Sequence, residues 1–258
     1  MTHINNSPVP YDEAYAAHLP VLGAVGQERL RRARVHVVGA GRVGSTLTQH
    51  LASAGIGALS SNDPQAVEPD NLNSLAFSRA DVGTKKVKAV SRRLASREHS
   101  RFRWIALPVE ADEVDAYIEA ADLVICCANT ASGRISAEKK AVLYGRPIMQ
   151  LAIFDGRDHL GGLIAIRLPE NPWSACAGCY LNPNRESEPA AGLLSTVAST
   201  LAAIAANMAV AILSGARAQM FRERNLFYVD LENYAIEALA AERRSGCPVC
   251  GGNGEANL

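Results

Sequence analysis

A glycine-rich turn at residues 39–44 constrains the fold more than any other feature of this sequence. Gly39, Gly41 and Gly44 form the pattern G-x-G-x-x-G, after a short β-branched segment at 35–38 and before residues 45–54, whose apolar positions recur at helical spacing. In that context Gly39 allows a tight turn, Gly41 lets the backbone approach a phosphate, and Gly44 permits close helix packing. The amino terminus of the following helix adds positive potential that favours a phosphate. The pattern predicts a nucleotide or dinucleotide ligand, and a turn without a ligand is the alternative.

An acidic residue about 20 positions after such a turn is expected to hold a ribose hydroxyl. Residues 57–62 predict a second short strand, and Asp63 follows it directly. On the glycine turn and Asp63 alone, NAD is the default ligand. Oxidoreduction linked to NAD is therefore one candidate function.

Helical and strand patterns alternate through the middle of the chain. Helices are predicted at 85–97 and 110–121, and strands at 102–108 and 123–127. Alternation of this kind indicates a parallel sheet with helices on both faces. Residues 146–168 then predict two or three strands joined by glycine-rich turns, antiparallel to one another. The fold class is therefore α/β, a doubly wound, Rossmann-like, mostly parallel sheet continued by antiparallel strands.

Two C-x-x-C pairs stand in turn-rich contexts, Cys176 with Cys179 and Cys247 with Cys250. Four thiolates at this spacing suit a tetrahedral zinc ion. Two unrelated pairs, or a redox C-x-x-C motif, are the alternatives. A closed structural zinc site would tie the end of the chain to the segment that follows the antiparallel strands.

Other cysteines and histidines carry weaker signals. Cys126 and Cys127 lie on an apolar strand, where free cysteine behaves as a small hydrophobe. The six histidines form no pair at metal-ligand spacing. His159, close to Asp155 and Asp158, could line a substrate groove, although a solvated turn is favoured.

Charge and hydropathy exclude several classes of partner. Lys plus Arg total 26 and Asp plus Glu total 26, so no global field attracts nucleic acid or an anionic membrane. The first residues have neither a basic start nor an apolar run, which predicts no secretory signal and a cytoplasmic location. Residues 195–215 are apolar enough to raise the question of a membrane span. Their many small side chains and Asn207 favour a helix in the core or at an interface.

The order of the motifs resembles the ThiF/MoeB family, the bacterial relatives of ubiquitin-activating enzymes. GQERL at 26–30 precedes the first strand, Asn71-Leu-Asn follows the predicted ribose carboxylate, and Val-Gly-Thr-Lys-Lys occupies 82–86. The apolar strand runs into LVICCANTASGR, which ends at Arg134, and an Ala-Gly-Leu-Leu segment opens the apolar helix. Both cysteine pairs fall at the family's spacing. The resemblance covers about residues 26–250.

This resemblance implies ATP at the glycine turn, with Asp63 on the ribose, Asn71 in the same cofactor-binding set and Lys86 near the phosphates. The implied reaction is adenylation of the terminal carboxylate of a small ubiquitin-like or sulfur-carrier protein, or of a peptide, with a flexible Gly-Gly tail. Such chemistry needs cations and usually magnesium beside the phosphate oxygens.

Several positions depart from the family pattern. Ser74 stands where the family has an arginine, and Arg79, five residues on, is a candidate substitute. Asn129 replaces the aspartate that holds magnesium, and its neutral amide is a weaker ligand for Mg²⁺. Glu188 aligns with the transfer cysteine of many members, so no thioester or persulfide step is expected. The family's usual amino-terminal arginine, which is offered to the site of the partner subunit, is not found in the first 20 residues.

We therefore take Lys86, Arg79, Arg134 and Asn129 as candidate catalytic residues. The first hypothesis is an adenylating enzyme. The second is a catalytically degenerate nucleotide-binding subunit that pairs with or scaffolds an active homologue.

The expected organisation is an amino-terminal arm at 1–25, an adenylation domain at 26–250 and a disordered tail at 251–258. A homodimer formed partly by the apolar helix is expected, and a heterodimer with an active homologue is the alternative.

Overall fold

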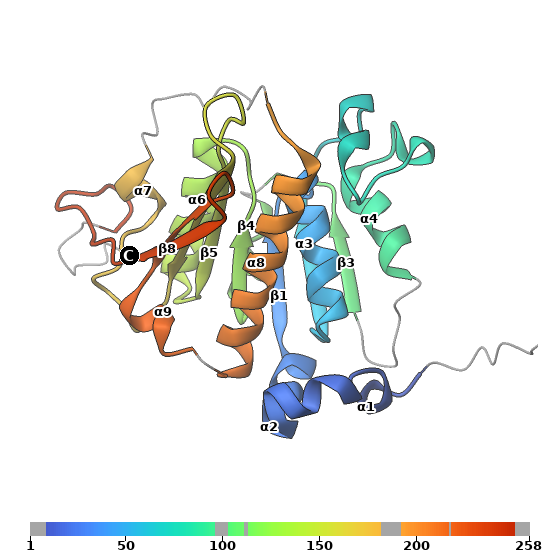
Figure 1. The fold of residues 1–258 in the computed structure, drawn as a ribbon, viewed down its shortest axis with the longest axis horizontal. Coiled ribbons are helices and arrows are strands. Elements are labelled where there is room, and N and C mark those ends of the chain that lie inside the picture. Colours follow the sequence, from blue (N-terminus) through green and yellow to red (C-terminus); the bar gives the residue numbers. More distant parts are fainter. Residues whose placement is uncertain (1–8, 96–102, 111–112, 182–191, 217, 251–258) are drawn as a thin grey trace, which may run out of the picture.

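The computed structural model describes residues 9–95, 103–110, 113–181, 192–216 and 218–250. Over these residues the chain forms a layered α/β structure with helices on both sides of one sheet (Figure 1). The sheet has eight strands in the spatial order β3-β2-β1-β4-β5-β6-β7-β8. They are β1 (Arg34–Val38), β2 (Ala58–Asn62), β3 (Arg103–Leu107), β4 (Leu123–Cys126), β5 (Ile148–Ile153), β6 (Gly161–Arg167), β7 (Leu226–Asp230) and β8 (Ala235–Leu239).

The strand order confirms a doubly wound sheet continued by antiparallel strands. β3, β2, β1, β4 and β5 run parallel, whereas β5, β6, β7 and β8 pair antiparallel. The chain passes from β1 outward through β2 to β3, then returns to the other side of β1 to form β4. Ligands of such sheets bind beyond the carboxyl ends of the strands at this reversal point. The glycine turn follows β1 there.

Helices cover both faces of the sheet. α3, α4 and α8 contribute to one apolar cluster with the central strands, and α5 and α6 contribute to a second cluster on the opposite face. The helices and 3₁₀ turns are α1 (Tyr11–Ala14), η1 (Ala16–His18), α2 (Leu19–Arg32), α3 (Arg42–Ser53), η2 (Pro69–Asn73), η3 (Arg79–Asp81), α4 (Lys86–Ala95), α5 (Asp115–Glu119), α6 (Ala131–Leu143), α7 (Ala177–Tyr180), α8 (Ser195–Ser214) and α9 (Met220–Glu223).

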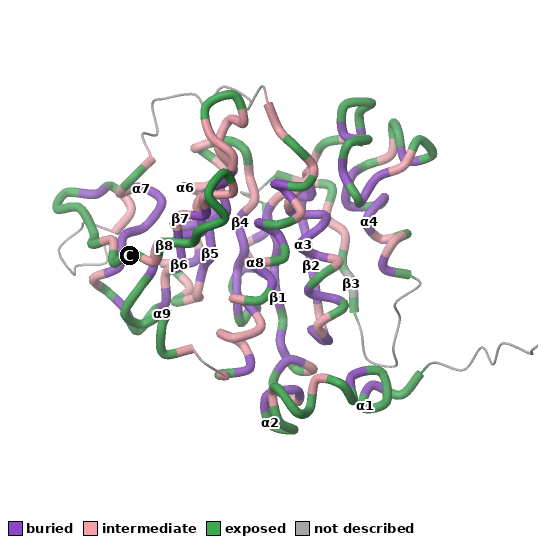
Figure 2. Tube along the Cα trace, viewed as in Figure 1, coloured by how far each residue is buried: buried purple, intermediate pink, exposed green. Residues whose placement is uncertain are grey.

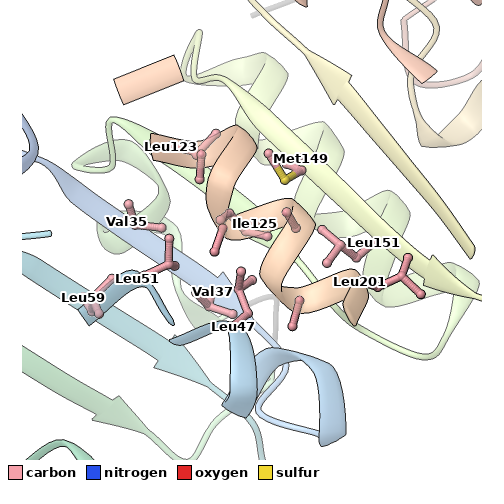
Figure 3. Close-up of a cluster of buried hydrophobic side chains, with 14 of the residues drawn as sticks. Val35, Val37, Leu47, Leu51, Leu59, Leu123, Ile125, Met149, Leu151 and Leu201 are labelled. Carbon is pink, nitrogen blue, oxygen red and sulfur yellow. The ribbon is translucent and has the colours of Figure 1, made fainter. Parts of the chain in front are cut away.

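Alternate residues of the central strands supply the two clusters, because successive strand side chains point to opposite faces. Val37 and Ile125 pack with Leu47 of α3 and Leu201 of α8 (Figure 3). Val124 points the other way, into the cluster with α5 and α6. Figure 2 shows the central strands buried and β8 largely exposed. The glycine turn thus follows a strand that is buried between the two clusters.

Helix α8 is long and apolar enough to cross a membrane, with a mean hydropathy of 1.9. In the structure it lies along α3 and α2 and also contacts β5 and β6. Val197, Leu201, Ala205 and Ala209 are buried against these elements. Of the prediction of a helix in the core or at an interface, packing in the core is confirmed, because one face of α8 is buried against the sheet and its neighbouring helices.

The segment before residue 26 has more structure than an arm. Helix α2 begins at Leu19 and is kinked at Gly23, which has a φ of +69°. The buried Tyr11 and Tyr15 hydroxyls donate to the carbonyls of Gly55 (2.7 Å) and Ala52 (2.9 Å). These bonds hold α1 against the end of α3. The domain boundary at residue 26 stays a prediction, and the tail at 251–258 lies outside the described residues.

Strands β7 and β8 go beyond the sequence prediction. The residues of β8, Ala-Ile-Glu-Ala-Leu, are good helix formers and nearly all are exposed, so they carry no alternating pattern. Pairing with β7 overrides this local preference. In the region predicted as a helix at 110–121, the described α-helix, α5, is confined to Asp115–Glu119.

Candidate functional site

The glycine turn is tight on one side and open on the other. Gly39 has a φ of +92°, and a Cβ there would lie 3.2 Å from the backbone of Cys127 and Ala128. A Cβ on Gly44 would lie 1.9 Å from the Gly39 carbonyl oxygen, so only glycine permits the contact between β1 and α3. A Cβ on Gly41, the N-cap of α3, would meet no heavy atom within 4 Å. A phosphate can therefore approach the backbone at Gly41.

Asp63 braces this turn. Its side chain is buried, and its Oδ2 accepts a 2.8 Å hydrogen bond from the Ala40 N–H. Its Oδ1 accepts another, also of 2.8 Å, from the N–H of Gln65. A carboxylate has about four acceptor positions, so capacity remains for a ribose hydroxyl. That role for Asp63 stays a prediction.

Lys86 is joined to the same network. It is the first residue of α4 and only 7% exposed, and its Nζ donates to Gln65 Oε1 over 2.7 Å. Gln65 is in turn held by Asp63, which braces the glycine turn. The partner of the ammonium in this bond is a neutral amide. The structure thus brings a buried cation to the network behind the glycine turn.

Asn71 and a residue that sequence reasoning missed define the neighbouring turn, η2. Asn71 Oδ1 accepts from the Glu68 N–H (3.1 Å), and its Nδ2 donates to Asp70 Oδ1 (2.9 Å). Arg42, inside the glycine motif, donates to Asp70 Oδ2 (2.8 Å) and Asn73 Oδ1 (2.7 Å). The sequence did not indicate Arg42, because the motif is defined by its glycines. The direction of the Arg42 side chain depends on η2, which the sequence does not place.

The four cysteines lie together at the far end of the sheet. The described Sγ–Sγ distances are 3.9 Å for Cys176–Cys179, 3.6 Å for Cys176–Cys247 and 3.5 Å for Cys179–Cys250. All four Sγ atoms lie within 4.8 Å of one another. Thiolates around a tetrahedral zinc ion, at Zn–S of about 2.3 Å, are about 3.8 Å apart. The donor set therefore fits that ion.

Backbone contacts tie the two cysteine segments together. The Ala175 N–H donates to the Ala241 carbonyl (2.9 Å), and the Arg243 N–H donates to the Trp173 carbonyl (2.8 Å). A Cβ on Gly178 would lie 2.5 Å from Val249 Cγ2, so the first C-x-x-C turn needs a glycine there. The segment before the chain end thus lies on the segment after β6, as predicted.

The sequence of residues 11–249 matches the model of the ThiF family. The chain belongs to the ThiF family.

Two of its relatives are named adenylyltransferases. The chain is 29% identical over 244 residues to the sulfur carrier protein adenylyltransferase of Thermus thermophilus, covering 90% of this chain and 88% of that protein. It is 26% identical over 234 residues to the sulfur carrier protein ThiS adenylyltransferase of Escherichia coli, covering 88% of this chain and 90% of that one. Similarity to these ThiF-family proteins therefore extends over nearly the whole length of each.

Solved structures of similar fold include E. coli MccB with ATP. That structure superimposes with a TM-score of 0.76 at 20% identity, covering 96% of this chain and 75% of that one. At this identity the comparison establishes the shared fold. It confirms the mixed sheet that the sequence predicts for a ThiF-family member.

The remaining candidate residues lie in separate segments. Arg79 is exposed on η3, and Asn129 is exposed directly after β4. Arg134 on α6 donates from Nη2 to the Leu151 carbonyl (2.5 Å) and from Nη1 to Gln150 Oε1 (3.5 Å), which ties α6 to β5. Catalytic roles for these three residues stay predictions.

A buried carboxyl that the sequence did not indicate lies beyond Arg134. Gln150 Nε2 donates to Glu138 Oε2 (2.9 Å) and to the Arg134 carbonyl (3.2 Å). Burial raises the pKa of the Glu138 carboxyl to about 7, although the Gln150 bond opposes that shift. Gln150 of β5 therefore links Arg134 to the buried carboxyl of Glu138, both on α6.

His159 is more enclosed than the favoured prediction of a solvated turn allows. Its side chain is 24% exposed, its Nδ1 lies 2.9 Å from Glu232 Oε2, and its ring stacks on Tyr228 with centroids 5.7 Å apart. Its partners belong to β7 and the turn after it, elements that the sequence did not predict. Cys126 is fully buried, and burial raises the pKa of its thiol, in keeping with a structural role.

A cavity of about 770 Å³ lies away from this site. It includes Arg34, at the start of β1, and Asp122 and Pro147, which precede β4 and β5. These are the amino ends of the strands, the edge opposite the glycine turn. The cavity is therefore separate from the candidate nucleotide site.

Proposed function

We propose that this ThiF-family chain is an enzyme that uses ATP to adenylate the terminal carboxylate of a small ubiquitin-like or sulfur-carrier protein, or of a peptide. One observation carries the proposal: Asp63 and Gln65 join the glycine turn to the buried ammonium of Lys86. A preorganised cation behind a phosphate-binding turn suits phosphoryl chemistry better than hydride transfer. The adenylyltransferase names of relatives at 29% and 26% identity support the same reaction.

In this reaction a carboxylate oxygen of the substrate attacks the α-phosphorus of ATP. An acyl–O–P bond forms, the bond between the α-phosphorus and the bridging oxygen breaks, and pyrophosphate leaves with that electron pair. Negative charge on the phosphate oxygens rises during the displacement. The N–H groups of the first turn of α3 and the ammonium of Lys86 would stabilise that negative charge. Asp63 would orient the adenosine by accepting from its ribose.

The residues present fit magnesium poorly. The position after β4, where the family resemblance implies an aspartate, holds the neutral amide of Asn129. Carboxylates are the preferred side-chain ligands of Mg²⁺. The proposed charge stabilisation therefore comes from Lys86 and from the N–H groups at the start of α3.

We propose zinc as a structural ion held by the four cysteine thiolates. Their mutual distances suit tetrahedral coordination, and four thiolates leave no open position for a reacting water. The ion would cross-link the two cysteine segments and stabilise the end of the sheet.

A second candidate function is a catalytically degenerate nucleotide-binding subunit that pairs with or scaffolds an active homologue. The small Ser74 and the neutral Asn129, where the family resemblance implies charged groups, favour it. Glu188, which replaces the family's transfer cysteine, lies outside the described residues. No thioester or persulfide step is proposed for either function.

Assembly as a homodimer is proposed, with a heterodimer as the alternative. Along α8, the side chains of Thr196, Thr200, Ala203 and Asn207 are exposed at intervals of one helical turn. Such small side chains would allow a second subunit to approach closely. The equal totals of 26 basic and 26 acidic residues give no global positive field, so no nucleic-acid or membrane partner is proposed, and the proposed location is the cytoplasm.

Pyrophosphate exchange into ATP tests the proposal. The purified chain is incubated with ATP, labelled pyrophosphate and a carrier protein ending in Gly-Gly, with a carrier lacking that tail as control. Exchange by the chain alone supports a stand-alone enzyme. Exchange that starts only when a second homologous subunit is added overturns it in favour of the degenerate subunit. Parallel titrations with ATP, ADP and NAD, with and without magnesium, identify the ligand.

A further inference from the structure

Arg42 carries a charged side chain that joins the glycine turn to η2. It is the first residue of α3 and follows Gly41, next to which the structure is open. Its side chain extends from the glycine turn to η2, where Nε donates to Asn73 Oδ1 (2.7 Å). Its Nη2 donates to the Asp70 carbonyl (3.0 Å) and to Asp70 Oδ2 (2.8 Å). The guanidinium therefore spans the glycine turn and η2.

The bonding of Arg42 leaves part of the guanidinium for a ligand. The three bonds to Asn73 and Asp70 use Nε and Nη2, and an arginine also carries two hydrogens on Nη1. The side chain is 24% exposed, so it is partly shielded from water yet within reach of a ligand. A planar fork of this kind suits phosphate oxygens better than a point charge does.

The neighbouring position that the family resemblance assigns to a cation cannot act in this way. Ser74 is only 8% exposed, and its Oγ accepts from the Ala76 N–H over 3.2 Å. Asn73, the residue before it, is the one that receives Arg42 Nε. The guanidinium of Arg42, which comes from the glycine turn, thus binds the residue that directly precedes Ser74.

We propose that Arg42 supplies the phosphate-binding cation of this site in place of a side chain at position 74. This inference rests on the proposed use of ATP and assigns the recognition of its phosphate chain to the guanidinium of Arg42. Asp70 pairs with Arg42, and the Asp70 side chain is 63% exposed, so the pair is readily rearranged. Asn73 then keeps the fork oriented as a phosphate oxygen is bound.

Titration calorimetry with ATP and with adenosine tests this role. In Arg42→Gln we expect ATP to bind about 10- to 100-fold more weakly, because a charge-assisted hydrogen bond to phosphate is lost. Adenosine, which has no phosphate, should bind within twofold of its affinity for the unmodified protein. The ATP affinity of Arg42→Lys should lie between those of the unmodified protein and Arg42→Gln, because lysine keeps the positive charge but lacks the planar fork of donors.

Arg32→Gln is the matched control. Arg32 also pairs with a carboxylate, that of Glu28, at 2.6 Å, and it lies at the end of α2, near the amino edge of the sheet. Its loss should leave the affinities for both ligands unchanged. Thermal unfolding of each variant separates a folding defect from a binding defect.

The outcomes separate this inference from the proposed function. Equal weakening of ATP and adenosine in Arg42→Gln, or no change in either, would overturn the role of Arg42. A selective loss of ATP affinity in a chain that shows no pyrophosphate exchange, alone or with a homologue, would support Arg42 and overturn adenylation. An unmodified protein that binds neither ligand would overturn both.

Discussion

The four-cysteine cluster and the glycine-turn site are built in different ways. In the cluster, four side chains of one type converge, and their Sγ separations of 3.5–3.9 Å suit a tetrahedral metal ion. At the glycine turn, the proposed phosphate site combines backbone N–H groups with two cations from different segments, Arg42 of α3 and Lys86 of α4. The cluster has a complete ligand set of one residue type in two C-x-x-C pairs, whereas the chemistry of the turn depends on which distant side chains reach it.

The sharpest test of this difference is Lys86→Ala. We expect pyrophosphate exchange to fall by at least about 10²–10³-fold, because one preorganised charge contact to the reacting phosphate is removed. Zinc content should not change. Lys85→Ala is the control, since Lys85 is exposed and its Nζ donates to the Pro64 carbonyl. Pyrophosphate exchange that survives in Lys86→Ala would contradict the proposed role of Lys86 at the glycine turn.

Removing one ligand of the cluster should produce the opposite pattern. For Cys247→Ser we expect less than one zinc per chain by elemental analysis and a loss of about 2–4 kcal/mol, as for a lost cross-link. The melting temperature should fall by about 5–15 °C, while ATP affinity stays within twofold. Cys126→Ala, which removes a buried thiol outside the cluster, should keep its zinc. Unmodified protein without zinc would contradict the prediction.

Asp63→Ala probes the brace of the glycine turn. The carboxylate accepts from Ala40 and Gln65, and the proposed ribose bond would be its third. We expect calorimetry to show adenine nucleotide binding weakened by about 1–3 kcal/mol, with unchanged zinc content. Tighter binding of NAD than of ATP by the unmodified protein would overturn the assignment of the ligand.

The smallest expected effect concerns the strand beneath the turn. Burial lowers the pKa of His36 from 6.5 to about 4, although the hydrogen bond with Asn62 opposes the shift. Between these values the unfolded chain binds a proton that the folded chain excludes, so stability falls as the pH drops from 6.5 toward 4. From pH 7.5 to 5.5 His36 should contribute a loss of about 1 kcal/mol.

Urea unfolding at several pH values measures this contribution. His36→Leu removes the titrating group, so its free energy of unfolding should depend less steeply on pH than that of the unmodified protein. Parallel slopes for the two proteins would contradict the shifted pKa. Zinc content measured at each pH separates this effect from loss of the ion.

Local patterns were enough to predict much of the fold. The glycine turn, the parallel strands and the core helix α8 each follow from residues that are close in sequence, through period-two or helical spacing. The pairing of the two cysteine segments follows as well, because four thiolates need one common centre. β8 could not be predicted in this way, since its helix-forming residues become a strand only through β7.

The sequence by itself determined the parallel strands of the sheet, the glycine turn and the identity of the four clustered cysteines. Only the tertiary structure decided that Asp63 braces Ala40, that Lys86 meets Gln65 and that Arg42 reaches Asn73. Backbone turns and ligand spacings depend on neighbouring residues, which the sequence shows directly. The direction of a charged side chain depends on segments that are distant in the chain and are brought together by packing of the sheet and helices.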